Sequence, residues 1–367
     1  MRQPAHGGNL AWAAALAGCP PDAILDFSAS ISPLGPPNSA IAAILSQIGN
    51  LKHYPDPNYS ELRLALSHFH QLPPEWILPG NGSAELLTLI GRELAQLAAT
   101  ILITPAFGDY YRTLAAYNAK VLECPLSLVT GHWSLVLSQA VGTASRREVL
   151  VNDKGQRTKD KGLLLNNPHN PTGKLFSRES ILPYLEQYAL VVVDEAFMDF
   201  VPPNEEQSLI PVVQEYANLV VLRSLTKFYS LPGLRLGYAI AHPDCLAKWQ
   251  LWRDPWPVNT LAAAAAIAAL QDTEFQQQTW AWLPPARNQL FQGLAEIPGL
   301  QPHASAANFL LVESQKSTSQ LQQQLLKHHQ ILIRDCLSFQ ELGDRFFRVA
   351  VREEFDNQRL LTALSGE

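Results

Sequence analysis

The hydrophobic pattern between residues 80 and 240 alternates short apolar runs with longer amphipathic segments. The apolar runs are continuous and end at polar or turn residues, which predicts strands at 100–104, 162–166, 190–194, 219–224 and 236–241. Runs without polar alternation are typical of strands that are buried on both faces of a sheet. Helices are predicted between them, for example at 83–97 and 178–187. This alternation predicts an α/β domain with a mostly parallel sheet.

The pattern changes after residue 257. An alanine-rich helix is predicted at 259–272, and a further amphipathic helix is predicted after Pro285. Two strands at 308–313 and 345–351 then flank a helix at 319–329, which predicts a smaller α+β domain. We therefore expect two domains and an N-terminal arm, because 367 residues exceed one small core. They are an N-terminal arm (1–40) that joins the small domain, a large α/β domain (41–250) and a small C-terminal domain (251–367).

Composition and charge exclude several classes of function. A net charge of −6 argues against a nucleic-acid partner, because phosphate binding draws on surplus lysine and arginine. The four cysteines form no CxxC pair, which fits reduced thiols in a cytoplasmic protein better than disulfides or a metal site. No apolar run approaches the roughly 20 residues that span a bilayer, so no membrane association is expected.

Two local features have ordinary interpretations. Residues 16–19 resemble a bacterial lipoprotein cleavage box, but the segment is better interpreted as a short helix. Asn9 is a suitable N-cap for that helix and Gly18 a suitable end. The basic stretch at 146–161 is interpreted as a solvated loop between strands.

Polar clusters follow three of the predicted strands. Asn-Pro-His-Asn-Pro-Thr-Gly at 167–173 follows the first, Asp194 ends the second, and Lys227 comes shortly after the third. Taken singly, these are an ordinary turn, a helix cap and a surface lysine. Ligands of parallel sheets bind at the carboxyl ends of the strands, so together they present an amide, a carboxylate and a lysine to one site. With Arg235 eight residues after the lysine, this set suits a phosphorylated pyridine aldehyde.

In this order and spacing, the motifs resemble the fold-type I enzymes that depend on pyridoxal 5'-phosphate (PLP), specifically the histidinol-phosphate aminotransferase group. The resemblance covers nearly the whole chain and implies that PLP is the cofactor. It implies that Lys227 carries PLP as a Schiff base and serves as catalytic acid or base. Asp194 matches the catalytic carboxylate that pairs with the pyridine nitrogen, and Asn170 matches the amide that bonds the ring hydroxyl. Phe107 matches the aromatic residue on the ring face.

The resemblance also implies the ligands of the cofactor phosphate. They are the start of a helix, whose free N–H groups and dipole suit an anion, two polar side chains, and a tyrosine from the neighbouring subunit. These residues are Gly82, Ser83, Ala84, Ser224, Arg235 and Tyr54. The tyrosine implies a homodimer. One departure is Phe197, which stands where many of these aminotransferases have a tyrosine that also bonds the ring hydroxyl.

Finer motifs are similar to one branch of the group, the threonine-phosphate decarboxylases. The distinctive ones are Ser-Leu-Thr-Lys-Phe-Tyr-Ser-Leu-Pro-Gly-Leu-Arg at 224–235 and Ile-Leu-Ile-Arg-Asp-Cys at 331–336. This likeness implies decarboxylation of L-threonine O-3-phosphate to (R)-1-amino-2-propanol O-2-phosphate for cobalamin biosynthesis. Against it, serines occupy positions 28, 30 and 32, where the branch usually has asparagines at some of them.

A substrate with a carboxylate and a phosphate requires two cationic anchors, and arginine bonds both groups through its fork. Arg348 matches the family arginine that holds the α-carboxylate, and Arg334 is the candidate for the phosphate. The same two arginines could serve histidinol phosphate or another amino acid, so an aminotransferase remains the alternative. A PLP-fold transcription regulator is disfavoured, because no basic helix-turn-helix segment accompanies the motifs.

Overall fold

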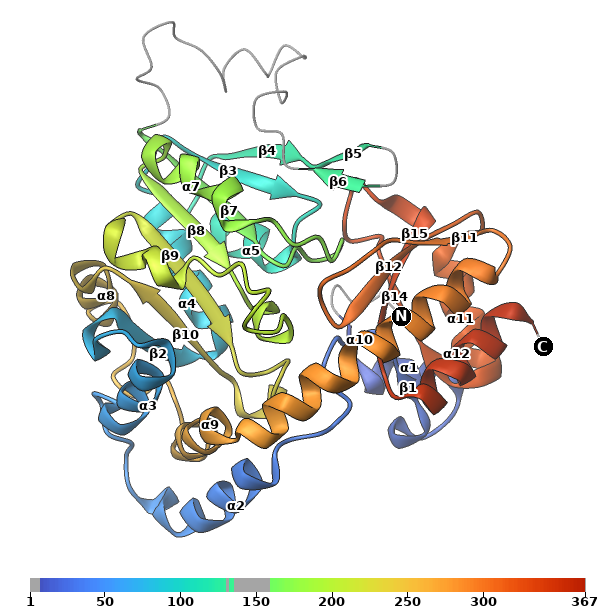
Figure 1. The fold of residues 1–367 in the computed structure, drawn as a ribbon, viewed down its shortest axis with the longest axis horizontal. Coiled ribbons are helices and arrows are strands. Elements are labelled where there is room, and N and C mark those ends of the chain that lie inside the picture. The colour runs from blue at the N-terminus through green and yellow to red at the C-terminus, as the bar shows by residue number, and fades with distance from the viewer. Residues whose placement is uncertain (1–6, 130–131, 135–158, 367) are drawn as a thin grey trace, which may run out of the picture.

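The computed structural model describes residues 7–129, 132–134 and 159–366 (Figure 1). Its largest sheet has seven strands, and strands β9, β8, β7, β3 and β4 run parallel while β10 is antiparallel to both neighbours. The order across the sheet is β2 (Ile77–Asn81), β10 (Leu236–Ala241), β9 (Leu219–Ser224), β8 (Leu190–Asp194), β7 (Lys161–Asn166), β3 (Ala99–Thr104) and β4 (Val121–Pro125). The predicted mostly parallel sheet and its five predicted strands are confirmed.

The two strands at the edges of this sheet, β2 and β4, were not expected. Their sequences lack the continuous apolar runs of the central strands: β2 contains Pro79 and Gly80, and β4 is partly exposed. Proline is tolerated at a sheet edge, where one side of the backbone needs no ladder partner. Edge position thus explains why the hydrophobic pattern gives so weak a signal there.

The central strands are apolar throughout because both faces of the sheet are covered. In β7, Leu163 and Leu165 pack on one face and Leu164 on the other, as the two-residue period of a strand requires. One face is covered by α4 (Gly82–Leu94), α5 (Gly108–Ala116) and α8 (Pro243–Gln250), and the other by α7 (Arg178–Gln187) and α9 (Thr260–Gln271). Each fully buried leucine contributes about 1.5–3 kcal/mol.

The C-terminal part contains a second, antiparallel sheet of four strands. Its order is β11 (Leu300–Pro302), β12 (Phe309–Ser314), β15 (Phe346–Ala350) and β14 (Arg334–Asp335). The accompanying helices are α10 (Thr273–Glu296), α11 (Thr318–His329) and α12 (Glu354–Ser365). The strands predicted at 308–313 and 345–351 and the helix predicted at 319–329 are confirmed to within a residue or so.

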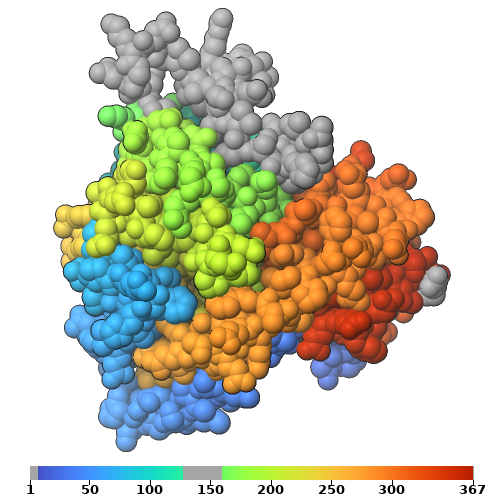
Figure 2. Space-filling model, in the orientation of Figure 1, coloured from blue at the N-terminus to red at the C-terminus, as the bar shows by residue number. Residues whose placement is uncertain are grey.

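Helix α10 corrects one prediction. The helix expected to follow Pro285 starts at Thr273 and runs through Pro284 and Pro285, crossing from the large sheet to the C-terminal part (Figures 1 and 2). The Asp272 carboxylate accepts a hydrogen bond from the Phe275 N–H and caps the start. Phe275, Thr279 and Leu283 are buried along the first half, so tertiary packing outweighs the loss of two backbone donors at the prolines.

The N-terminal arm begins with α1 (Leu10–Ala17), which confirms the predicted short helix. The Asn9 side chain accepts from the Trp12 N–H, and Gly18 ends the helix at a φ of 70°. Strand β1 (Leu25–Asp26) then pairs in parallel with β13 (Ile331–Leu332), so the arm is tied to the C-terminal part. Beyond the arm, the chain continues into α2 (Asn38–Gln47) and α3 (Ser60–His70).

Strands β5 (Ser127–Val129) and β6 (His132–Ser134), which the sequence did not predict, form a small antiparallel pair. The basic stretch at 146–161 lies outside the described residues as far as residue 158. Within the described residues, no helix is both long enough and apolar enough to cross a membrane.

Candidate active site

A cavity of about 230 Å³ lies at the carboxyl ends of β7, β8 and β9. Ten of the twelve predicted site residues line it, although they come from segments far apart in the chain. These residues are Ser83, Ala84, Phe107, Asn170, Asp194, Ser224, Lys227, Arg235, Arg334 and Arg348. Gly82 lies beside the cavity, against the guanidinium of Arg235. Tyr54 lies elsewhere: it is 80% exposed and stacks on Trp256 with 4.4 Å between ring centroids.

Lys227 follows β9 and is placed among other charged groups. Burial first, and then the nearby cations Arg348 and Arg235, lower the pKa of its amine to about 8, against the attraction of Asp194. An amine with this pKa is partly neutral near neutral pH, which is the form that attacks an aldehyde. The Lys227 carbonyl accepts a hydrogen bond of 3.0 Å from the Ser32 N–H, so the N-terminal arm contacts the backbone at Lys227.

Asp194 is the last residue of β8, and each of its carboxylate oxygens has a donor. Oδ1 accepts from the Ala196 N–H at 3.0 Å, and Oδ2 accepts from the Tyr110 hydroxyl at 2.7 Å. Burial raises the pKa of Asp194, and the two hydrogen bonds and the Lys227 charge oppose that shift. A buried carboxylate in this setting suits a protonated ring nitrogen as its ion-pair partner.

An anion cradle forms where α4 begins. Gly82 has a φ of 71°, and a Cβ there would stand 2.7 Å from Nη2 of Arg235, so only glycine lets the arginine approach. A Cβ at Gly237 would stand 2.7 Å from the Ser83 nitrogen, so this glycine lets β10 pack against the helix start. Free N–H groups at a helix N-terminus and a guanidinium together form a phosphate site, and Ser224 adds its hydroxyl to the lining.

Arg348 lies on β15 and is buried, with a relative exposure of 8%. It donates to Asn170 Oδ1 and, at 3.1 Å, to the Ser28 carbonyl, while its Nε has no partner among the described residues. No carboxylate of the described chain pairs with it, and burial, with the charge of Arg334 next, lowers its pKa to about 10. A buried cation with a donor left over is suited to a substrate anion.

Arg334 stands directly opposite Arg348 in the ladder between β14 and β15. Its Nη2 donates to the Ser338 hydroxyl at 2.6 Å, and both residues line the cavity. Side chains at facing positions of an antiparallel pair lie on the same face of the sheet. Two guanidinium groups on one wall of the cavity suit a ligand with more than one negative group.

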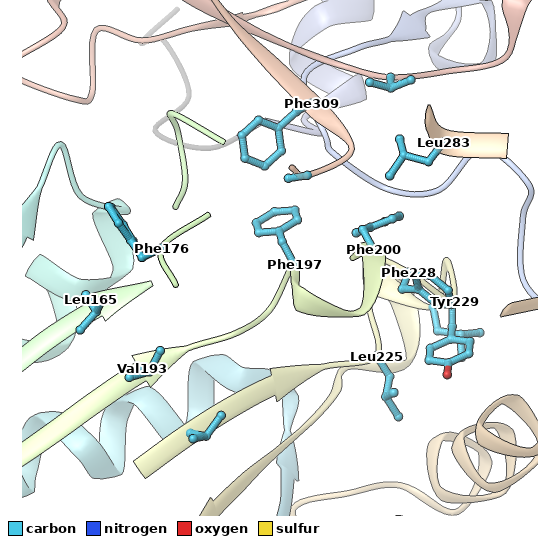
Figure 3. Packing of buried hydrophobic residues seen from close by; sticks show 14 of the residues in the cluster. Leu165, Phe176, Val193, Phe197, Phe200, Leu225, Phe228, Tyr229, Leu283 and Phe309 are labelled. Atoms are coloured by element: carbon cyan, nitrogen blue, oxygen red, sulfur yellow. The ribbon is translucent and has the colours of Figure 1, made fainter. Parts of the chain in front are cut away.

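Two aromatic residues shape the remaining walls. Phe107 lines the cavity and meets the Tyr110 ring edge-on, with 5.7 Å between centroids and an interplanar angle of 87°. Phe197, the departure from the family pattern, packs edge-on against Phe309 at 5.0 Å (Figure 3). Because Phe197 has no hydroxyl, the amide of Asn170 is left as the predicted donor to a ring hydroxyl.

Sequence reasoning missed several residues that line the cavity, among them Tyr110, Asn166 and Ser338. Each had a weak local signal. Tyr110 follows Phe107 by three residues at the start of a helix, so both face the same side. Asn166 is a polar residue that ends a buried strand, and Ser338 follows Arg334 by four residues.

Comparisons with known proteins fit this geometry. A family model for class I and II aminotransferases matches residues 22–364. The chain is 39% identical over 365 residues to threonine-phosphate decarboxylase of Salmonella typhimurium, covering 98% of this chain and 95% of that protein. It is 32% identical over 340 residues to histidinol-phosphate aminotransferase of Symbiobacterium thermophilum, with 91% and 88% covered. The crystal structure of histidinol-phosphate aminotransferase from Clostridium acetobutylicum superposes with a TM-score of 0.81, at 28% identity, covering 94% and 98%.

The chain belongs to the class I and II aminotransferase family, and its fold is that of the fold-type I PLP-dependent enzymes. The predicted family, fold class and PLP cofactor are confirmed, and the protein is an enzyme. The cavity fits PLP: the glycine cradle with Arg235 suits its phosphate, Asp194 suits its ring nitrogen, and the Lys227 amine suits its aldehyde.

Proposed function

We propose that this enzyme decarboxylates L-threonine O-3-phosphate to (R)-1-amino-2-propanol O-2-phosphate, the aminopropanol phosphate of the cobalamin side chain. The observation that carries the proposal is the pair of arginines at facing positions of β14 and β15, both lining the cavity that holds Lys227. A substrate with a carboxylate and a phosphate uses both cations. The name and the 39% identity of the Salmonella typhimurium relative support the same reaction.

We assign the cofactor contacts residue by residue. Lys227 would hold PLP covalently and later move the proton at the substrate Cα, and Asp194 would keep the ring nitrogen protonated. Bound PLP withdraws electrons from the Cα of an amino acid joined to its aldehyde carbon. Phe107 would cover the ring face and Asn170 would donate to the ring hydroxyl. The phosphate would be held by Gly82, Ser83, Ala84, Ser224 and Arg235, and by Tyr54 of a second subunit.

For the substrate, Arg348 would hold the α-carboxylate and Arg334 the phosphate. Arg348 is the better choice for the carboxylate, because its charge acts on the pKa of Lys227, to which the substrate Cα must lie close. The orientation that these anchors impose decides which Cα bond breaks, because the bond perpendicular to the ring is the one weakened. Decarboxylation requires the carboxylate to stand in that position.

The proposal includes a homodimer in the cytoplasm, and the division of the chain into an arm (1–40), a large domain (41–250) and a small domain (251–367). Tyr54 is exposed and stacked on Trp256, which suits a tyrosine that reaches a neighbouring subunit. Large apolar side chains nearby in sequence are exposed as well, as a subunit interface requires. They are Ile41, Leu45, Ile48 and Leu51. The four cysteines are free, which suits a reducing compartment.

The deciding experiment supplies the PLP-loaded protein with L-threonine O-3-phosphate and follows carbon dioxide and aminopropanol phosphate. We expect the two products in equal amounts. Replacing Lys227 by Ala should abolish turnover. Arg334→Met should weaken the binding of L-threonine O-3-phosphate far more than the binding of free L-threonine. No carbon dioxide from the wild-type protein would contradict the proposal.

The second candidate is an aminotransferase acting on histidinol phosphate. It is favoured by the likeness to the Clostridium acetobutylicum structure and the Symbiobacterium thermophilum relative. Histidinol phosphate has a phosphate and no carboxylate, but 2-oxoglutarate, the partner substrate of that reaction, has two carboxylates, so the facing arginines are compatible with this alternative as well. Glutamate formed from histidinol phosphate and 2-oxoglutarate, without carbon dioxide from the first substrate, would establish this alternative.

A further inference from the structure

Tyr110 is a buried residue of the cavity wall to which the function proposed above gives no role. It lies in the first turn of α5, is 1% exposed, and donates its hydroxyl to Asp194 Oδ2 at 2.7 Å. Its ring also meets Phe107 edge-on. Tyr110 therefore contacts both residues assigned to the pyridine ring, the one beside its nitrogen and the one on its face.

The hydrogen bond from Tyr110 has a fixed direction. Burial and the neighbouring Asp194 charge hold the pKa of the phenol well above its usual range, so it keeps its proton at every working pH and can only donate to the carboxylate. Donation to a charged carboxylate stabilises that form. Burial alone favours the neutral acid at Asp194, and Tyr110 is the largest of the groups that oppose burial there.

We propose that Tyr110 is a positioning residue that keeps Asp194 ionised and aimed at the ring nitrogen of PLP, and so sets the protonation of that nitrogen. This inference rests on the pairing of Asp194 with the ring nitrogen proposed above. With the Ala196 N–H on Oδ1, Tyr110 on Oδ2 fixes the carboxylate plane, and the remaining lone pairs are left for the ring. A mobile or protonated Asp194 could not hold the nitrogen proton.

Tyr110→Phe tests the hydroxyl separately from the ring. The phenylalanine keeps the edge contact with Phe107, and only the donor to Asp194 is lost. The neighbouring Tyr111 offers a matched control, because its hydroxyl donates to Glu123 Oε1 at 2.8 Å on the same helix but outside the cavity lining. Tyr111→Phe therefore removes the same kind of phenol–carboxylate bond without touching Asp194.

The direct readout is the ¹⁵N NMR shift of the ring nitrogen in holoenzyme loaded with ¹⁵N-labelled PLP, recorded across pH. In Tyr110→Phe, Asp194 binds its proton more strongly, so the ring nitrogen signal should move toward the unprotonated position. We also expect about 10-fold weaker PLP binding and about 10-fold lower kcat, with the KM of the amino acid changed less than twofold, since a hydrogen bond to a charged group carries an effect of this order. Tyr111→Phe should match the wild-type protein in all of these measurements.

A second variant changes the strength of the hydrogen bond from Tyr110 in the opposite direction, so that a misfolded Tyr110→Phe protein would not leave the inference untested. Tyr110→3-fluorotyrosine keeps the residue and makes its hydroxyl a stronger donor, so the ring nitrogen signal should move toward the protonated position. An unchanged ¹⁵N shift in both Tyr110 variants would overturn the inference. Asp194→Asn tests the pairing of Asp194 with the ring nitrogen separately from the role of Tyr110. If it alters the ¹⁵N shift while the Tyr110 variants do not, only the role of Tyr110 fails. If Asp194→Asn also leaves the shift unchanged, the proposed pairing of Asp194 fails with it.

Discussion

The molecule contains two buried arginines whose surroundings differ in charge. Arg223, at the end of β9, is 2% exposed and pairs with three carboxylates, those of Glu195, Asp199 and Glu206. Arg348, on β15, is nearly as buried, yet its partners in the described chain are neutral: an amide oxygen of Asn170 and a backbone carbonyl. Both lie close to the cavity, because Arg223 directly precedes Ser224 in the lining.

The pKa shifts of the two guanidinium groups express this difference. Burial lowers the pKa of Arg223, but the charges of Asp199 and Glu195 outweigh burial and hold the pKa well above its usual value. Burial, and after it the charge of Arg334, lowers the pKa of Arg348 to about 10. A buried charge without a counter-ion costs stability. The fold therefore neutralises Arg223 within the chain, whereas Arg348 forms no ion pair among the described residues.

The largest effect is expected from Arg348→Gln, which removes a cation that forms no ion pair in the described part of the chain. The kcat/KM for the amino acid substrate should fall about 1,000-fold, or about 4 kcal/mol, because a buried pair with the substrate anion is lost. The apo protein should unfold at the same or a higher temperature, since the uncompensated charge is gone. Steady-state kinetics and thermal unfolding of the same preparations check both statements.

Arg348→Lys is the matched control, because it keeps the charge but loses the fork that bonds a carboxylate with two donors. Its kcat/KM should lie between those of the wild-type protein and Arg348→Gln. A marked fall in the unfolding temperature of apo Arg348→Gln would contradict the comparison, since Arg348 would then be as structural as Arg223.

Arg223→Met should show the opposite division between stability and activity. Removing this cation leaves three carboxylates facing one another in a buried site, which costs about 3–4 kcal/mol. The unfolding temperature should fall by many degrees, while the KM of the substrate in the folded fraction should change little. Adding Glu206→Gln to the variant should restore part of the loss, because one of the three facing charges is removed. A double variant no more stable than the single one would argue against charge repulsion as the cause.

The same cluster predicts how stability depends on pH. Burial raises the pKa of Glu195 from 4.5 to about 7, against the attraction of Arg223. Between these values the folded protein holds a proton that the unfolded chain has released, so the contribution to stability is full below pH 4.5 and is lost as pH rises to about 7. Relative to Glu195→Gln, the wild-type free energy of unfolding should fall by up to about 3 kcal/mol across this range. Urea unfolding at several pH values measures it, and parallel curves for the two proteins would refute it.

The sequence was sufficient to bring together the cavity residues that lie in local motifs. Lys227, Asp194 and Asn170 each lie at or just after the end of a continuous apolar strand, and parallel topology brings the carboxyl ends of such strands together. The hydrophobic pattern also predicted the central strands, because a strand that is buried on both faces has a continuous apolar sequence. It failed at the edge strands and at α10, where packing of Phe275 and Leu283 outweighs the two prolines that locally end a helix.

The contacts that the sequence could not reveal are those between distant segments. Tyr110 meets Asp194 across 84 positions, and Arg348 meets Asn170 and Ser28 across 178 and 320 positions. No local spacing encodes these bonds, because they depend on how α5 packs over β8 and how the arm crosses the C-terminal sheet. That no carboxylate of the described residues forms an ion pair with Arg348 is likewise a property of the folded chain alone.

The smallest effect is a shift in the reactivity of Lys227. Burial lowers the pKa of its amine to about 8, and the charge of Arg348 is the next cause. Since only the neutral amine attacks an aldehyde, the rate at which the apo protein reacts with PLP should rise with pH and level off above about 8. Removing the Arg348 charge should move this midpoint upward by about one pH unit, or about 1.4 kcal/mol. Stopped-flow absorbance measures the rates.

Arg223→Lys is the control and should leave the midpoint in place, because that cation is already neutralised by its own carboxylates. A midpoint that moves equally in both variants would mean that Lys227 does not distinguish the two arginines.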